Sequence, residues 1–103
     1  MNISRESLRQ VVQELMNDVI EQGFHHLMHY PQQGDELNRI IKDATEELNY
    51  QLLKIDSHSF PPESDALGKH YDIICQDTQN KSLELLARLQ HVMVLDNPRL
   101  RRV

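Results

Sequence analysis

The sequence predicts an all-α protein, an antiparallel bundle of three long helices, and three observations lead to this prediction. Apolar residues recur at helical spacing along three long segments. Only three Gly and four Pro interrupt the 103 residues, too few for many short strands joined by tight turns. The chain has no Trp, three Tyr and two Phe, so aliphatic side chains must fill the core, as in helix bundles. We expect residues 1–103 to form one domain.

The first helix is predicted over residues 4–22, with a short helical continuation over 24–29. Apolar pairs recur every fourth residue from Val11-Val12 to Leu27-Met28. Because a helix has 3.6 residues per turn, this stripe drifts by roughly 40° at each step. The drift requires either two different neighbours or a break at Gly23. We favour the break, since glycine commonly caps the C-terminal ends of helices.

The second helix is predicted from Asp35 to about Asp56 and has the clearest helical pattern in the chain. One narrow stripe holds Leu37, Ile41, Ala44, Leu48, Leu52 and Ile55, with Ile40 beside it. The opposite side carries two pairs of opposite charge at four-residue spacing, Arg39 with Asp43 and Lys42 with Glu46.

The third helix is predicted from Pro62 or Ser64 to about Leu95. One face gathers Leu67, Tyr71, Ile74, Thr78, Leu85, Leu89 and Val92. The polar stretch 77–82 is weakly helical, so a break near Asn80 is an open alternative. Residues 96–103 are expected to be a mobile basic tail. Three helices of this length leave apolar surface at the edges of a monomer, so a homodimer is also an open alternative.

The charge of the chain limits its partners. With the six His neutral the formal net charge is −5, and an acidic chain is repelled by phosphate backbones and anionic lipid. No apolar run is long enough to span a bilayer and none resembles a signal peptide. Cys75 is the single cysteine, so no internal disulfide can form. We therefore expect a cytoplasmic protein that binds neither membranes nor, in general, nucleic acid, and that needs no cofactor.

Two histidines are the best candidates for metal ligands. His25 and His29 are four residues apart, so on a helix they project from the same side. A zinc site needs three or four ligands, and no further ligand stands at a suitable spacing. We therefore predict that both imidazoles face solvent, and we assign no metal.

Three carboxylates on the second predicted helix suggest an alternative function. Asp43, Glu46 and Glu47 invite comparison with the all-α nucleotide pyrophosphohydrolases, which bind Mg²⁺ through paired acidic motifs on helices. Asp72 and Asp77 on the third helix would supply the second half of such a site. Only the Asp43/Glu46 half of the pattern is present. The three carboxylates also lie opposite the aliphatic stripe, so we expect them to point into solvent.

A cluster of arginines ends the chain. Arg99, Arg101 and Arg102 offer either a weak nucleic-acid contact or a contact to an acidic partner. Three arginines provide only weak, salt-sensitive binding to phosphates.

Apolar residues outside the core stripes are the strongest functional candidates. Tyr50 and Leu53 lie on the back of the second helix, and Ile73 and Leu83 are displaced on the third. If Tyr50 and Leu53 joined the drifting stripe of the first helix, they would form one partner-binding patch. We therefore predict a small helical protein-interaction module, of the adaptor, regulator, chaperone or toxin-neutralising type, without enzymatic activity.

Overall fold

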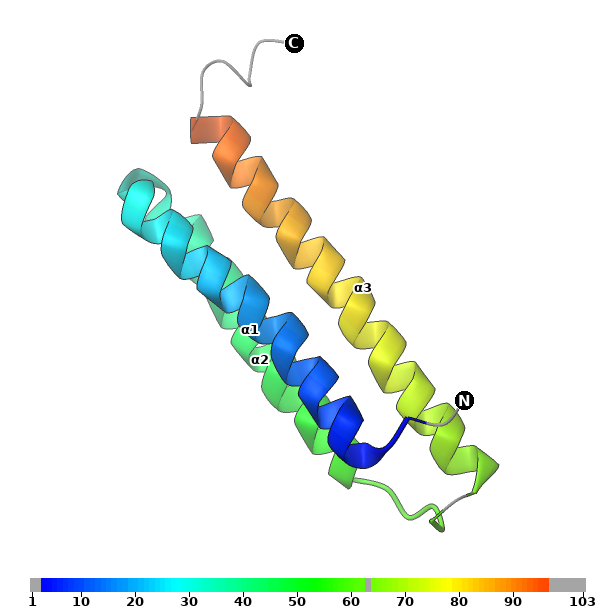
Figure 1. The fold of residues 1–103 in the computed structure, drawn as a ribbon. Coiled ribbons are helices and arrows are strands. Elements are labelled where there is room, and N and C mark those ends of the chain that lie inside the picture. Colours follow the sequence, from blue (N-terminus) through cyan, green and yellow to red (C-terminus); the bar gives the residue numbers. More distant parts are fainter. Residues whose placement is uncertain (1–2, 63, 97–103) are drawn as a thin grey trace.

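The structure is a computed structural model that describes residues 3–62 and 64–96. Its elements are α1 (Arg5–His29), the short 3-10 helix η1 (Pro31–Gln33), α2 (Gly34–Asp56) and α3 (Asp65–Asp96). All three long helices pack against one another, and no strand occurs within the described residues. The prediction of an all-α three-helix bundle is thus confirmed. In Figure 1, α1 and α3 run in the same direction and α2 runs in the opposite direction.

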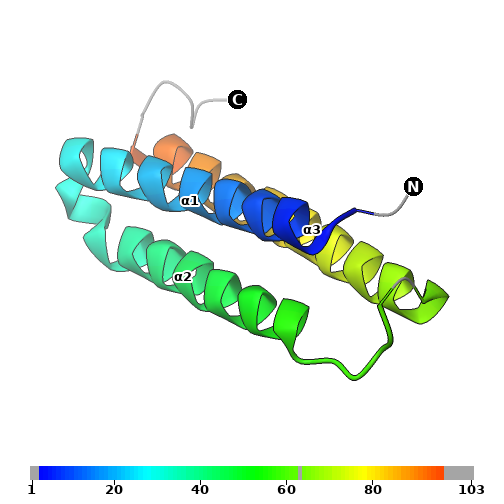
Figure 2. The ribbon, with the colours of Figure 1, turned by 60° about the horizontal axis from the view of Figure 1, so that its bottom comes forward.

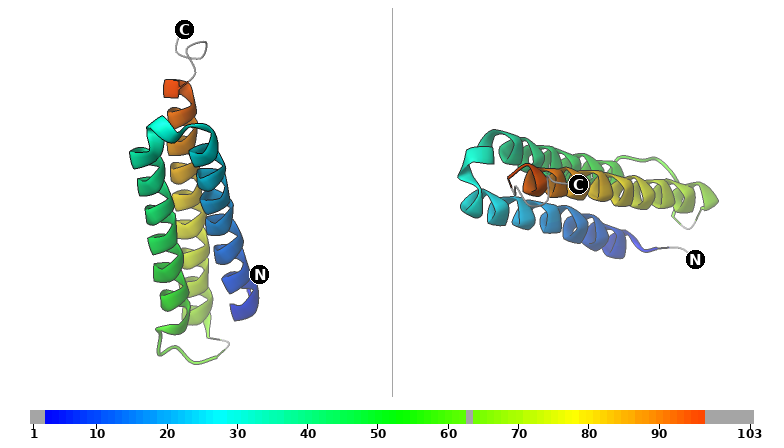
Figure 3. Two further views of the ribbon diagram at one scale, coloured as in Figure 1. Left: turned by 90° about the vertical axis from the view of Figure 1, so that its left-hand side faces the viewer. Right: turned by 90° about the horizontal axis from the view of Figure 1, so that it is seen from above.

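The two ends of the bundle differ. At one end η1 turns the chain tightly from α1 into α2, and α3 extends past this turn (Figure 3). At the other end the chain continues past the end of α2 before it turns back to α3 (Figure 2). The first turn of α1 lies at this second end, beside the start of α3 (Figure 1).

Serine hydroxyls cap two of the helices. The Ser4 Oγ accepts a hydrogen bond from the Ser7 backbone N–H at 3.1 Å, and the Ser64 Oγ accepts one from the Leu67 N–H, also at 3.1 Å. Each satisfies a donor that the first turn of a helix would leave unpaired. The starts of α1 and α3 are therefore determined by local sequence.

The core has two apolar parts. One lies towards the η1 end and the other towards the α2–α3 connection. The first consists of Met16, Val19, Leu37, Ile40, Ala44, Leu85, Leu89 and Val92, and the second of Leu8, Val12, Ile55, Tyr71 and Ile74. Three buried polar residues, Gln51, Thr78 and Ser82, belong to neither part. Their positions along α2 and α3 lie between those of the two apolar parts, so they form a polar layer across the middle of the bundle.

The predicted break at Gly23 is wrong, because α1 is continuous from Arg5 to His29. Gly23 is buried, and a Cβ there would lie 2.6 Å from Ile41 Cγ1. The glycine therefore permits a close approach of α1 to α2 instead of ending the helix. The alternative break near Asn80 is also absent, since α3 is continuous across residues 77–82. There Thr78 and Ser82 face the core, and the Thr78 hydroxyl donates to the Ile74 carbonyl at 2.7 Å.

Within the part of the chain that the structure describes, no helix has the length and apolar character needed to cross a membrane. The first residue of the predicted basic tail, Asp96, ends α3, and the rest, with Arg99, Arg101 and Arg102, lies outside the described residues.

Candidate partner-binding surface

Three large apolar side chains lie exposed on α2 and α3. Tyr50 is 56% exposed, Leu53 65% and Ile73 57%. Tyr50 and Leu53 are three residues apart and so are neighbours on the surface of α2. All three residues were predicted to lie outside the core, and the structure confirms this.

Contacts of Lys54 bring Ile73 opposite these α2 residues. The His70 Nε2–H donates to the Lys54 carbonyl at 2.9 Å, and the Lys54 Nζ lies 3.9 Å from Asp77 Oδ2. Positions 70, 73 and 77 follow one another along a single side of a helix, so Ile73 lies between two residues that touch Lys54. The Lys54 Nζ also lies 5.2 Å from the centroid of the Tyr50 ring. We call Tyr50, Leu53 and Ile73 the α2–α3 patch.

The α2–α3 patch therefore has residues on α2 and α3, whereas the sequence analysis considered a patch shared by the first and second helices. Tyr50 lines hollows shared with Asp77, Asn80 and Lys81 of α3. The condition that Tyr50 joins the stripe of α1 is not met, because Tyr50 lies on the side of α2 that faces α3.

A groove runs alongside the α2–α3 patch, between α2 and α3. It consists of two adjoining shallow hollows of about 320 and 290 Å³, which share Glu47, Tyr50 and Lys81. We call it the acidic groove, since five of its lining residues are carboxylates. The full lining is Asp43, Glu46, Glu47, Tyr50, Gln51, Asp77, Asn80, Lys81 and Glu84.

Arg88 of α3 pairs with Asp43, one of the residues that line the acidic groove. Its guanidinium donates to Asp43 at 2.7 Å and to Glu36 at 3.3 Å. The hydrogen bond to Asp43 is the main cause that raises the pKa of Arg88 above its ordinary value. Arg39, the predicted partner of Asp43, instead lies 3.6 Å from Glu36. The other predicted pair is confirmed, with Lys42 Nζ 3.9 Å from Glu46.

The prediction that Asp43, Glu46 and Glu47 all point into solvent is wrong for two of them. Asp43 and Glu47 are half-buried against α3, and Glu46 is exposed. Positions 43 and 47 flank the buried stripe on the side where α3 packs, and Arg88 and Gln51 supply them with donors. Among the residues whose side chains are described, no three or more His, Cys, Asp or Glu are grouped so as to hold a metal ion.

Gln51 is the residue of the acidic groove that the sequence prediction missed. It is 2% exposed, and its Nε2 donates to Glu47 Oε2 at 2.7 Å. Its Oε1 is buried without a hydrogen-bond partner. The alternating three- and four-residue spacing 37, 40, 44, 48, 51, 55 would have placed Gln51 in the core. The predicted apolar stripe contains Leu52 in place of Gln51, because an amide is an uncommon core residue.

The two candidate metal ligands lie in solvent, as predicted. His25 and His29 are exposed, with ring centroids 4.5 Å apart. The His29 Nδ1–H donates to the His25 carbonyl at 3.0 Å. Cys75 is half-buried and packs against the apolar part of the core that contains Tyr71 and Ile74.

Other exposed apolar side chains lie away from the α2–α3 patch. Phe24 and Met28 are 52% and 80% exposed on α1, and Leu83 is 66% exposed on α3. Leu83 was predicted outside the core, but it does not line the acidic groove. Met28 belongs to the last apolar pair of the drifting stripe described for the first helix. With Gly23 inside the core, positions 8, 12, 16, 19 and 23 form the buried stripe of α1 and turn 24 and 28 outwards.

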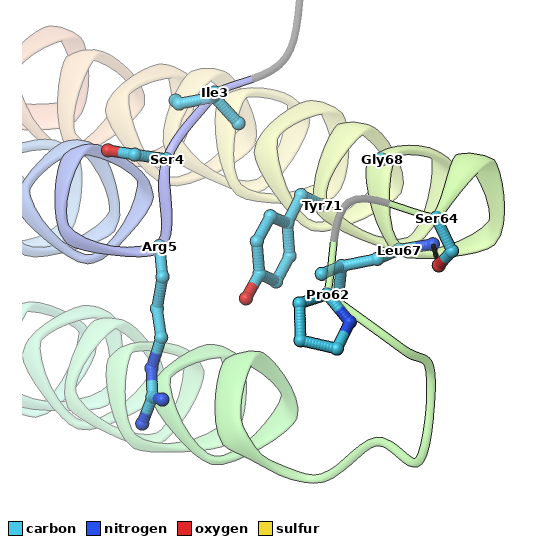
Figure 4. Close-up of a pocket in the computed structure, with 8 residues that line it drawn as sticks. All are labelled: Ile3, Ser4, Arg5, Pro62, Ser64, Leu67, Gly68 and Tyr71. Carbon is cyan, nitrogen blue, oxygen red and sulfur yellow. Dashed lines mark hydrogen bonds between the residues drawn. The ribbon is translucent and has the colours of Figure 1, made fainter.

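A separate hollow of about 310 Å³ lies at the end of the bundle where the N-terminal segment meets α3 (Figure 4). Ile3, Pro62, Leu67 and Tyr71 give it apolar walls. Figure 4 shows the Tyr71 ring projecting into this hollow, whereas Arg5 extends away from it towards α2. Arg5 there pairs with Asp56, which also pairs with Arg9.

No protein-family model, no curated protein and no solved structure matches this chain.

Proposed function

We propose that this chain is a helical protein-interaction module that binds a partner protein through the α2–α3 patch. The observation that carries the proposal is that three large exposed apolar side chains, Tyr50 and Leu53 of α2 and Ile73 of α3, lie near the junction of two packed helices. Single exposed apolar residues are normal on a protein surface, whereas contiguous ones mark interaction sites. Tyrosine is also enriched among the residues that dominate binding energy at interfaces.

The surroundings of the α2–α3 patch support binding more than catalysis. The nearby carboxylates face cations or amides of their own chain: Asp43 faces Arg88, Asp77 faces Lys54 and Glu47 faces Gln51. A Mg²⁺-dependent nucleotide hydrolase needs several carboxylates directed at one point. Such convergence has no support among the described side chains. The proposal includes a cytoplasmic location, on the ground of the lone Cys75.

Site-specific photo-crosslinking tests the proposal. A benzophenone amino acid replaces Tyr50, Ile73 or, as a control, the exposed Glu21 of α1, in cells that naturally make the chain. We expect positions 50 and 73 to give an adduct of the same mass and position 21 to give none. Equal adducts from position 21, or no adduct from positions 50 and 73, would contradict the proposal. Circular dichroism of each purified variant verifies that the bundle has folded.

A further inference from the structure

We infer that the partner presents a basic amphipathic helix, whose apolar side chains pack on the α2–α3 patch while its Lys or Arg side chains enter the acidic groove. This inference rests on the proposed function and adds the chemistry of the partner.

The charge of the acidic groove selects a cation. Its lining contains five carboxylates and one ammonium group, Lys81, a formal charge of −4. Three cations outside the hollows, Lys42, Lys54 and Arg88, each pair with one of these carboxylates. They still leave one carboxylate unmatched. A basic side chain is the group that completes the pairing, and an acidic one would be repelled.

The unmatched carboxylate is Glu47, at the centre of the groove. It lines both hollows, and among the described side chains no Lys, Arg or His nitrogen lies within 4.0 Å of it, although every other groove carboxylate has such a partner. Its one hydrogen bond comes from the neutral amide of Gln51. A half-buried carboxylate without a cation is costly, so a partner ammonium or guanidinium at this point stabilises the complex.

The groove and the patch together have the dimensions of a helix. Along α2 they extend from Asp43 to Leu53, ten residues or about 15 Å at 1.5 Å per residue. Three turns of a partner helix cover this length. On α2, the apolar residues Tyr50 and Leu53 lie at the C-terminal end of this stretch. The carboxylates Asp43, Glu46 and Glu47 precede them along the same helix. Binding of an amphipathic helix in a groove between two helices uses this kind of surface.

Fluorescence anisotropy with two designed peptides tests the inference. The probe is a labelled helix-forming peptide of about five turns, with Leu along one face and Lys on its flanks. The control peptide keeps every Leu and replaces Lys by Glu. We expect the Lys peptide to bind and the Glu peptide to bind at least about tenfold more weakly, a difference of about 1.4 kcal/mol. Binding of the Lys peptide should weaken as salt increases.

Matched variants locate the binding. Glu47→Gln keeps an acceptor for the Gln51 amide and removes the charge, so we expect about five- to tenfold weaker binding of the Lys peptide. Glu21→Gln, the same change on the exposed side of α1, should alter binding less than twofold. Ile73→Ser should weaken binding and Leu83→Ser should not. Circular dichroism confirms the folding of each variant.

The outcomes separate this inference from the proposed function. Crosslinks from positions 50 and 73 together with equal binding of the Lys and Glu peptides would overturn the inference and leave the proposed function standing. A chain that self-associates through the patch, with its solution mass halved by Ile73→Ser and no competition by the Lys peptide, would identify a second copy as the occupant. That result, too, would overturn the inference. Unchanged binding of the Lys peptide by Glu47→Gln would likewise count against it.

Discussion

The junction between α1 and α2 and the junction between α2 and α3 are built in different ways. At the first, Gly23 lets the helices approach until Ile41 occupies the place of a side chain, and Arg5 and Arg9 both pair with Asp56. At the second, charged residues flank the helices and two hollows lie open between them. Along one flank α2 therefore packs closely on α1, whereas along the other it meets α3 through charged pairs beside open hollows.

The tight α1–α2 approach can be tested by adding a single methyl group. Gly23→Ala places a Cβ 2.6 Å from Ile41 Cγ1. Overpacking costs about 1–3 kcal/mol, and the better helix propensity of Ala returns up to about 1 kcal/mol. We expect a net loss of about 1–2 kcal/mol in the free energy of unfolding, measured by urea denaturation.

Gly34→Ala is the matched control for this substitution. Gly34 has a helical backbone, with φ −57° and ψ −39°, and its Cβ would lie 3.6 Å from Leu27 Cδ1, an ordinary contact. We expect no loss of stability, or a gain of up to about 1 kcal/mol. Equal effects of the two substitutions would show that the approach at Gly23 is not close.

The α2–α3 junction should depend on Arg88 more than on any exposed ion pair. Arg88→Ala leaves Asp43 and Glu36 without their shared cation, and we expect it to lower the free energy of unfolding by about 1 kcal/mol, a charged hydrogen bond reduced by partial exposure. Arg39→Ala removes a 72% exposed partner of Glu36 and should cost under about 0.5 kcal/mol. Chemical denaturation of both variants measures the difference, and equal losses would mean that Arg88 does not join α2 to α3.

In the polar layer, unlike at Gly23 and Arg88, we expect one substitution to stabilise the folded protein. Gln51→Leu removes a buried carbonyl oxygen that has no hydrogen-bond partner, so the free energy of unfolding should rise by about 1 kcal/mol. Gln51→Ala leaves a cavity instead and should lower it by about 1–3 kcal/mol. A loss of stability in Gln51→Leu would show that the hydrogen bond from Gln51 Nε2 to Glu47 stabilises the fold more than the unpaired Oε1 destabilises it.

Acid should weaken the α1–α2 junction through Asp56. The hydrogen bond from Arg9 is the main cause that lowers the pKa of Asp56 below its ordinary value of 3.8. Because the folded pKa is the lower one, the contribution of Asp56 is complete above about pH 4 and is lost as pH falls through the folded pKa. The stability difference between wild type and Asp56→Asn should therefore shrink between pH 5 and pH 2. A difference that stays constant over this range would contradict the assignment.

Much of this fold could be predicted from the sequence, because the signals are local. Ser4, Ser64 and Pro31 define helix ends, and the stripe from Leu37 to Ile55 gives α2 its inward side. Gly23 was misinterpreted because a glycine that ends a helix and one that admits a neighbouring helix look the same until the neighbour is known.

The candidate site was predictable only in part, for the same reason. The exposure of Tyr50, Leu53 and Ile73 follows from the period of each helix taken alone. That Ile73 lies opposite Tyr50 and Leu53 depends on the register between α2 and α3, which the Lys54–His70 contact reveals. The half-burial of Asp43 likewise depends on Arg88, 45 residues further along the chain.

The most direct test of an open α2–α3 junction is a ¹⁵N NMR titration of the intact chain with the Lys-flanked amphipathic peptide. The shifts should concentrate on residues 43–54 of α2 and 73–84 of α3, with the resonances of α1 little changed. Shifts centred on Phe24 and Met28, or spread over the junction of α1 and α2, would contradict the claim that α2 reserves its α3 side for a partner.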